Sequence, residues 1–382
     1  MKIPVLYQLE NSIREIKDYV DDLRADNEFK HKLKKILKEN HKNCYRENYR
    51  VFPDLNKKQG APNTDFTEEL PPKIDSVVSL TRHINIKGLN HTYQNLADES
   101  SKDLLLRVIA YRILGHTRIR LPLADENFWL PMIDLEKKCK KDECMETKFW
   151  KLNYFDLTAI GYDIRLFFNT ESVFIGLGLK EYGYDKGEVD FKVEKGDYVI
   201  DGGACYGDTA LYFAHDAGED GKVFSFEFLQ DNLNVFEKNL ELNPKLKDRI
   251  KLFQNALWEN SNENLFIVEN GPASYCSMSE PGNYTQKVET KSIDDLVESG
   301  EIPKVDFIKF DIEGAEMEAI KGCEKTIKKF KPKLAICLYH KNEHFISIPK
   351  YIKDLVPEYK LYIDHHTMAE GETVMYAIAP KG

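Results

Sequence analysis

From residue 160 onward the chain alternates short apolar runs with helical patterns, and this alternation most limits how it can fold. The apolar runs have the composition of β-strands and lie at residues 198–201, 222–227, 250–254, 307–311, 334–339, 359–364 and 374–379. Strands separated by helices build successive βαβ units and a mostly parallel sheet. We therefore predict an α/β fold, with a doubly wound Rossmann-like sheet, for residues 151–382.

The first 150 residues have a different pattern. Apolar residues recur at spacings of three and four within residues 13–37, which indicates an amphipathic helix or helix pair. Residues 101–115 open with a cap-like serine and end at a glycine, so they predict a buried helix. Residues 52–75, rich in proline and acids, have the composition of a linker. We expect residues 1–150 to be a mainly helical accessory region that shapes the neighbouring site or makes a homodimer contact.

The charge balance opposes a nucleic acid as the main partner. The 382 residues include 64 acidic and 54 basic side chains, a formal net charge of −10, which a phosphate backbone would repel. No apolar run approaches the roughly 18 residues of a transmembrane helix. The N-terminus turns polar at Gln8, too early for a secretory signal. We expect a cytoplasmic protein that binds neither nucleic acid nor membrane.

A strand, a glycine turn and a helix follow one another at residues 198–214. The glycines do not fit the G-x-G-x-x-G spacing of dinucleotide sites; Asp201, Gly203 and Gly207 instead form D-x-G-x-x-x-G. An acid at the strand end would repel a pyrophosphate but suits a ligand with an ammonium and a sulfonium. The pattern favours S-adenosylmethionine, with a nucleotide site and a purely structural turn as alternatives. The expected cofactor-binding residues here are Asp201, Gly202, Gly203, Ala204 and Gly207.

The next two strand ends extend this site. Glu227 ends the second strand, 26 positions after Asp201, and one carboxylate can accept hydrogen bonds from both hydroxyls of a ribose. Asn255 and Ala256 follow the third strand. Asn255 is placed to contact the adenine edge, and a simple turn residue is an equal alternative for it.

These motifs together resemble the FkbM family of methyltransferases over residues 160–382. The matching segments are V-I-D-G-G-A at 199–204, F-E at 226–227, N-A-L at 255–257 and I-K-F-D-I-E-G-A-E at 308–316. Weaker similarity extends upstream to residues 111–115 and 120–123. The family commonly has proline where this chain has Leu229, a difference that we expect to affect only the turn. The resemblance implies O-methylation of hydroxyls, often on sugars or polyketide-type products.

Methyl transfer to a hydroxyl needs alignment of oxygen, carbon and sulfur and removal of a proton by a base or a metal. Such groups belong at the carboxyl ends of the strands. Asp311 ends the fourth strand and His340 follows the fifth, so we predict that both are catalytic. For Asp311 the alternative is a helix cap. Histidine suits a base because it titrates near neutral pH. A divalent cation stays an open question.

Further polar residues are candidates to line an acceptor pocket. Glu313 lies in the first turn of a helix, where acids are favoured anyway, and Lys341 is a candidate phosphate or acceptor contact. For the pair at 365–366 we expect one histidine to face the cleft and the other solvent. The expected acceptor-lining residues are Tyr182, Ser274, Glu313, Lys341 and His365.

The predicted function is an S-adenosylmethionine-dependent O-methyltransferase that acts on a sugar or sugar nucleotide, for a surface glycan or a secondary metabolite. The expected partner is thus a small-molecule acceptor. Alternatives are a non-sugar hydroxyl, a phosphorylated small metabolite, or a cofactor-binding domain without turnover. A nicotinamide oxidoreductase is disfavoured by the glycine spacing.

Overall fold

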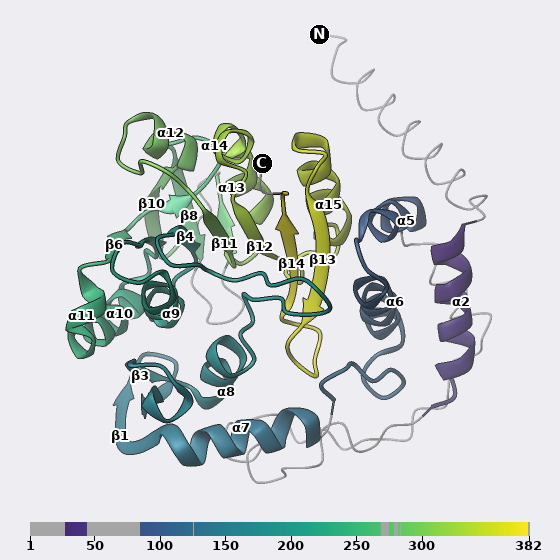
Figure 1. Ribbon diagram of the computed structural model, residues 1–382, viewed down its shortest axis with the longest axis horizontal. Coiled ribbons are helices and arrows are strands. Elements are labelled where there is room, and N and C mark those ends of the chain that lie inside the picture. Colours follow the sequence, from purple (N-terminus) through teal and green to yellow (C-terminus); the bar gives the residue numbers. More distant parts are fainter. Residues whose placement is uncertain are drawn as a thin grey trace.

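The computed structural model describes residues 27–43, 85–124, 126–268, 275–278, 282 and 284–380. Its centre is a seven-stranded sheet with the order β13-β14-β12-β11-β4-β5-β6 (Figure 1). The strands are β4 (Tyr198–Gly202), β5 (Lys222–Phe226), β6 (Ile250–Phe253), β11 (Phe307–Phe310), β12 (Lys333–Cys337), β13 (Lys360–His365) and β14 (Thr373–Ile378). All seven predicted strands are confirmed, with ends that differ by one or two residues.

The sheet is mostly parallel, and β14 is the one strand of the seven that runs opposite to the other six. The chain winds from β4 through β5 to β6, and then continues on the other side of β4 from β11 to β12. Ligands of open α/β sheets bind outside the carboxyl ends of the strands at such a reversal, which here lies between β4 and β11.

Helices cover both faces of the sheet, so the prediction of a doubly wound fold is confirmed. They are α9 (Asp208–Ala217), α10 (Gln230–Leu242), α11 (Pro244–Lys247), α12 (Ile293–Glu298), α13 (Glu316–Lys321), α14 (Glu324–Phe330) and α15 (His344–Leu355). Alternate strand residues enter different cores: Val199 packs with α9 and α10, and Ile200 with α12 to α15. This burial on two faces explains why the strands are continuous apolar runs.

Two smaller sheets flank the central one. One has the order β7-β10-β8-β9 and consists of β7 (Ala256–Leu257), β8 (Asn264–Val268), β9 (Tyr275–Ser277) and β10 (Gln286–Lys291). The other consists of β1 (Lys140–Glu146), β2 (Lys151–Asp156) and β3 (Arg165–Phe168) in that order, followed by the short α8 (Thr170–Val173) and a π-helical turn (Phe174–Gly178). Position 150, where we expect the two regions to divide, lies between the paired strands β1 and β2.

The described part of the N-terminal region is mainly helical, as predicted. Its described helices are α2 (Glu28–Asn40), α5 (Ile86–Asn95), α6 (Glu99–Leu114) and α7 (Glu126–Cys139). The apolar stripe of α2, with Phe29 and Leu33, is buried in the same core as α5, α6 and α15. That stripe is therefore covered within the chain, and the homodimer contact stays a prediction. Residues 13–26 and 52–75 lie outside the described residues.

Residues just before and within α6 cover the edge strand β13, next to which α6 lies in Figure 1. The amide of Ala97 donates to the carbonyl of Leu361 over 2.8 Å, and the amide of Ile363 donates to Ser101 Oγ over 3.0 Å. The N-cap of α6 is Asp98 rather than the serine that we expected, because Ser101 faces β13 instead. These two hydrogen bonds therefore occupy backbone groups on the outer edge of β13 that could otherwise pair with another strand.

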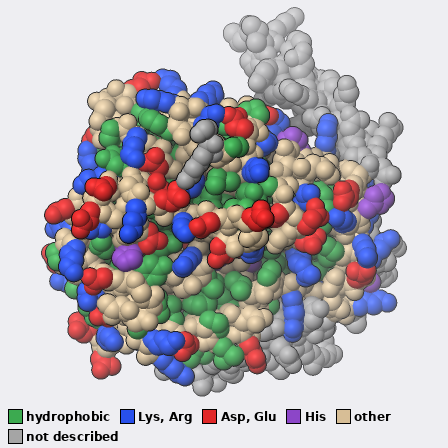
Figure 2. Space-filling model, viewed as in Figure 1, with side chains coloured by type: hydrophobic (Ala, Val, Ile, Leu, Met, Phe, Trp, Pro, Cys, Tyr) green, Lys and Arg blue, Asp and Glu red, His purple; other side chains and the backbone are tan. Residues whose placement is uncertain are grey.

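The surface carries charges of both signs. On the face seen in Figure 2, basic and acidic side chains are interspersed. Among the described helices, none combines the length and apolarity needed to cross a membrane.

Candidate active site

The glycine turn after β4 lies directly against the end of β11. Gly203 has φ +77°, and a Cβ there would lie 1.8 Å from the carbonyl oxygen of Asp311. Gly207 has φ +84°, and its Cβ would meet the ring of Phe236 at 2.9 Å. Only glycine fits such close approaches at positive φ. The predicted cofactor turn and the predicted catalytic strand end are therefore neighbours.

Asp201 supports this turn from beneath. Its side chain is fully buried and accepts hydrogen bonds from the hydroxyls of Thr209, at 3.0 Å, and Ser225, at 3.1 Å. Because a strand alternates the direction of its side chains, the carboxylate points between the sheet and α9. A direct contact of Asp201 with a cofactor stays a prediction.

Lys309, which lies within the motif at residues 308–316, holds the glycine turn in place and was not among the predicted site residues. Its side chain is 1% exposed, and Nζ donates to the carbonyls of Gly202, at 3.0 Å, and Gly203, at 2.6 Å. Nζ also lies 3.4 Å from Asp201 Oδ1. Burial lowers the pKa of Lys309, but the nearby carboxylates raise it more, so the net shift is upward and the ammonium stays charged. A lysine inside an apolar strand is the signal that could have identified it.

Glu227 lies at the same edge, at the end of β5. Its Oε1 accepts from the amides of Phe228, at 2.6 Å, and Leu229, at 2.7 Å, and its Oε2 from Asn232 at 3.1 Å. Burial raises the pKa of Glu227 although these hydrogen bonds oppose the shift. We expected leucine in place of proline at position 229 to affect only the turn, but it also affects Glu227. A proline has no amide hydrogen and could not donate the hydrogen bond that Leu229 donates to Glu227.

Asn255 and Ala256, which follow the third strand of the βαβ series, make structural contacts within the protein. The amide of Asn255 donates to the carbonyl of Glu289 over 3.1 Å, in agreement with a turn residue. Ala256 is buried beside Leu265 in the core of the four-stranded sheet β7-β10-β8-β9. Their contact with a cofactor stays a prediction.

The predicted catalytic pair, Asp311 and His340, is brought together. His340 Nε2 lies 3.4 Å from Asp311 Oδ1. The hydroxyls of Tyr182 and Tyr339 donate to the two carboxylate oxygens of Asp311 over 3.0 and 3.1 Å. The helix-cap alternative for Asp311 does not hold, because Glu316 accepts from the amides of the following turn instead. Tyr182 thus contacts the predicted catalytic pair, and its acceptor-lining role stays a prediction; Tyr339 was missed.

Glu316 fixes the imidazole ring of His340 through its Nδ1 atom. It is fully buried, and its Oε1 lies 2.8 Å from Nδ1 of His340, while Oε2 lies 3.2 Å from Nδ1 of His344. Burial would raise the pKa of Glu316, but hydrogen bonds from the two histidines hold it well below its usual range. Burial lowers the pKa of His340, yet Glu316 and the neighbouring acids outweigh it and raise that pKa to about 9.

Two further expected residues border this pair. Glu313 has φ +55°, and its side chain is 71% exposed, with Oε2 3.6 Å from His340 Nε2. Lys341 is exposed, and its Cε would lie 2.9 Å from a Cβ on Gly314, which has φ +94°. Glycine at 314 thus leaves room for the stem of Lys341 beside the cluster.

A second pair of acids lies near Asp311 and was not predicted. Glu181 and Glu372 share a hydrogen bond, and burial raises the pKa of both carboxyl groups. The charge of Asp311 adds to this shift, so the pair retains a proton more readily than exposed acids do. The two residues are far apart in sequence, and no local pattern indicates that they meet.

The remaining expectations fall outside this cluster. His365 and His366 are both buried, so the expectation that one of them faces solvent is wrong. Burial lowers the pKa of His365 to about 3, and its Nδ1 lies 2.8 Å from Thr373 Oγ1. His365 is on β13, which β14 separates from β12, so the structure does not bring it to Asp311. Ser274 lies outside the described residues.

Comparison with known proteins agrees with this arrangement. The family model of the methyltransferase FkbM domain matches residues 201–365. Hexuronic acid methyltransferase AglP of Haloferax volcanii is 30% identical over 141 residues, which are 36% of this chain and 54% of AglP. The crystal structure of methyltransferase FkbM from Methylobacillus flagellatus KT is similar with a TM-score of 0.50 at 20% identity, over 80% of this chain and 61% of that one.

The chain thus spans just over half the length of AglP. The matched segment holds the glycine turn, Glu227 and the motif with Asp311, which carried the resemblance in sequence, and it also contains His340. Over residues 201–365 this chain therefore matches the methyltransferase FkbM domain.

Proposed function

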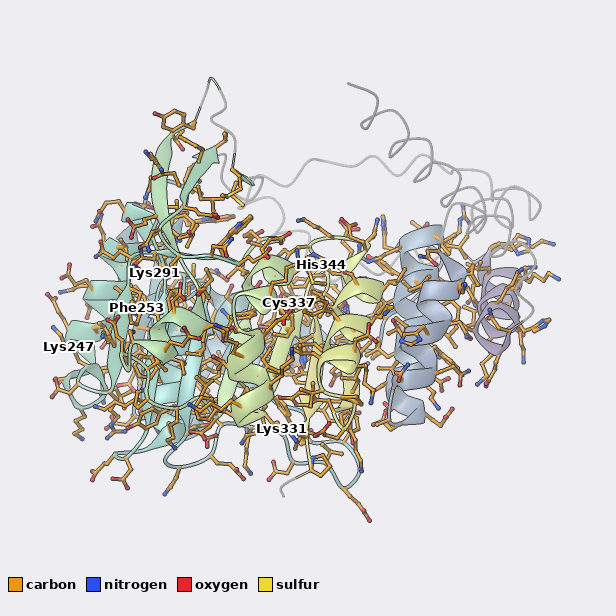
Figure 3. The ribbon with its side chains drawn as sticks, turned by 90° about the horizontal axis from the view of Figure 1, so that it is seen from above. Lys247, Phe253, Lys291, Lys331, Cys337 and His344 are labelled. Atoms are coloured by element: carbon orange, nitrogen blue, oxygen red, sulfur yellow. The ribbon has the colours of Figure 1, made fainter. Side chains whose placement is uncertain are left out.

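We propose that the chain is an S-adenosylmethionine-dependent O-methyltransferase for a hydroxyl of a sugar-type acceptor. The observation that carries the proposal is the direct contact between the glycine turn and the strand end at Asp311. The proposed cofactor turn and the Asp311–His340 pair therefore lie side by side at the carboxyl edge of the sheet, as a methyl transfer between them requires. In Figure 3 this edge lies on the upper side of the sheet, where Phe253 and Cys337 end β6 and β12, and Lys331, just before β12, lies below them.

The cofactor would lie over the turn with its ribose at Glu227. One oxygen of the carboxylate is held by the amides of Phe228 and Leu229, and the other accepts from Asn232 and keeps a further lone pair for a ribose hydroxyl. The hydroxyl oxygen of the acceptor then attacks the methyl carbon, the carbon–sulfur bond breaks, and the sulfonium leaves as a neutral thioether. The hydroxyl proton leaves at the Asp311–His340 pair.

A sugar-type acceptor is supported by the similarity to AglP, which is a hexuronic acid methyltransferase. A non-sugar hydroxyl or a phosphorylated metabolite stays the alternative. The test is transfer of labelled methyl from S-adenosylmethionine to a panel of hexuronic acids, sugar nucleotides and non-sugar alcohols. Label on the sugar compounds supports the proposal; label only on the non-sugar alcohols contradicts it.

The Glu227→Gln variant is expected to bind S-adenosylmethionine about 10- to 100-fold more weakly, because hydrogen bonds to a charged acceptor contribute about 1.5–3 kcal/mol. Glutamine keeps an oxygen for the two backbone amides, so the turn should persist. Calorimetric titration measures the change, and Glu237→Gln, on an exposed position of α10, is the matched control. Equal affinities for both variants would remove Glu227 from the cofactor site.

Arg112 connects the N-terminal region to this site. From α6 its guanidinium donates to the carbonyls of Tyr339, at 3.1 Å, and Glu370, at 3.0 Å, and to Asn342 Oδ1 at 2.8 Å. These acceptors belong to the segments that carry Tyr339, His340 and Glu372. We propose that the accessory region shapes the acceptor site through this side chain.

The Arg112→Met variant should therefore lower kcat about 10- to 100-fold, since small displacements of catalytic groups have effects of that order. Methionine keeps the apolar stem in place over Phe345. The affinity for S-adenosylmethionine should stay unchanged, because the glycine turn is not touched. Arg107→Met, at an exposed position of the same helix, is the control. An unaltered kcat in Arg112→Met would show that α6 does not support the site.

A further inference from the structure

One nitrogen of His340 is buried without a hydrogen-bond partner among the described residues. The side chain of His340 is only 8% exposed, and it is Nε2 that lacks the partner. This atom faces Asp311 Oδ1 at 3.4 Å and Glu313 Oε2 at 3.6 Å. Leaving a buried polar atom unpaired costs free energy, and a ligand bound to Nε2 would remove that cost.

The other nitrogen is held by Glu316. Nδ1 of His340 lies 2.8 Å from Glu316 Oε1, and the same carboxylate is fixed by the amides of Ile312 and Gly314 and by His344 on α15. Figure 3 shows His344 at the same end of the sheet as Cys337. A carboxylate on one ring nitrogen is the usual arrangement behind a metal-bound histidine, because it fixes the tautomer and orients the ring.

We propose that Nε2 of His340 and the carboxylates of Asp311 and Glu313 bind a divalent cation such as Mg²⁺ or Mn²⁺. Among the described residues, one ligand atom each from Asp311, Glu316 and His340 lies within 4.8 Å of the others, and Glu313 adds an oxygen 3.6 Å from His340 Nε2. We assign Glu316 to the supporting role because its Oε1 is used by backbone amides and Nδ1. A cation with bonds of about 2.1 Å separates neighbouring ligands by about 3 Å, close to the spacing of Nε2 from the two carboxylates.

Three protein ligands leave further coordination positions for the acceptor. In this role, which rests on the proposed function, a cation held by these residues would lower the pKa of the acceptor hydroxyl. Asp311 and His340 would then promote loss of the hydroxyl proton as ligands of the cation rather than as the base itself. The cation also offsets the negative charge of Asp311, Glu313 and Glu316, which would otherwise repel an acceptor that carries its own carboxylate.

The binding itself can be tested without cofactor or acceptor. Titration of the purified full chain with Mn²⁺, followed by the electron paramagnetic resonance signal of free Mn²⁺, should reveal one site per chain that Mg²⁺ competes for. Asp311→Asn and His340→Ala should each weaken Mn²⁺ binding at least tenfold. Glu313→Gln should weaken it several-fold, and this exposed side chain can be changed without risk to the fold.

Glu343→Gln is the matched control, because Glu343 is an exposed acid three residues after His340. Its Mn²⁺ affinity should equal that of the parent. Absence of Mn²⁺ binding in the parent, or the same affinity in all four variants, overturns the cation site and leaves the proposed function standing. Specific Mn²⁺ binding by a chain that transfers no methyl group to any acceptor supports the site and contradicts only the proposed function.

Discussion

Replacing Asp311 by asparagine is expected to lower the rate of methyl transfer about 10²–10⁴-fold, the usual contribution of a positioned acid–base group. The same loss is expected for His340→Ala. Asp311 receives the hydroxyls of Tyr182 and Tyr339, so the asparagine retains the shape of the cluster but loses its charge. Single-turnover rates with the acceptor bound measure the effect on the chemical step.

The affinity for S-adenosylmethionine should change by less than about threefold in both variants, because the proposed cofactor contacts lie on β4 and β5 and each tenfold loss would need about 1.4 kcal/mol. Glu343→Gln, which removes a nearby exposed acid, should retain the parent rate. Rates close to the parent in Asp311→Asn and in His340→Ala would leave alignment of the reactants as the source of catalysis.

The central sheet could be predicted because its strands are local patterns. Each is an apolar run that the fold buries on both faces, and each is separated from the next by a helix or a polar segment. Parallel strands also end at one edge, so the proximity of Asp311 and His340 follows from their positions in sequence. Their separation of 3.4 Å agrees with that reasoning.

The parts that escaped prediction depend on contacts between distant segments. Glu181 meets Glu372, and Arg112 meets Tyr339, across sequence separations that no periodicity covers. The role of Asp201 was also inferred only in part. Its place at the strand end was visible, but whether its carboxylate points upward to a ligand or inward to Lys309 depends on the pleat.

The second large expected effect is a loss of stability when Lys309 is replaced. The Lys309→Met variant should lose about 3–5 kcal/mol of unfolding free energy, the cost of leaving one member of a buried ion pair without its partner. Methionine has similar bulk and fills the same space, so little of this loss arises from a cavity. The carbonyls of Gly202 and Gly203 also lose their donor. Urea unfolding measures the change through a lower midpoint at an unchanged slope.

Two comparisons separate this explanation from a general loss of a lysine. Lys238→Met removes an exposed lysine that pairs with Glu241 on α10, and such surface pairs contribute only about 0–1 kcal/mol. Adding Asp201→Asn to Lys309→Met removes the uncompensated charge, so the double variant should recover part of the lost stability. A loss below about 1 kcal/mol in Lys309→Met would mean that Thr209 and Ser225 satisfy Asp201 without the lysine. The glycine turn would then be held by its close packing against Asp311 and by the hydrogen bonds of the Gly203 and Ala204 amides to the carbonyl of Phe226.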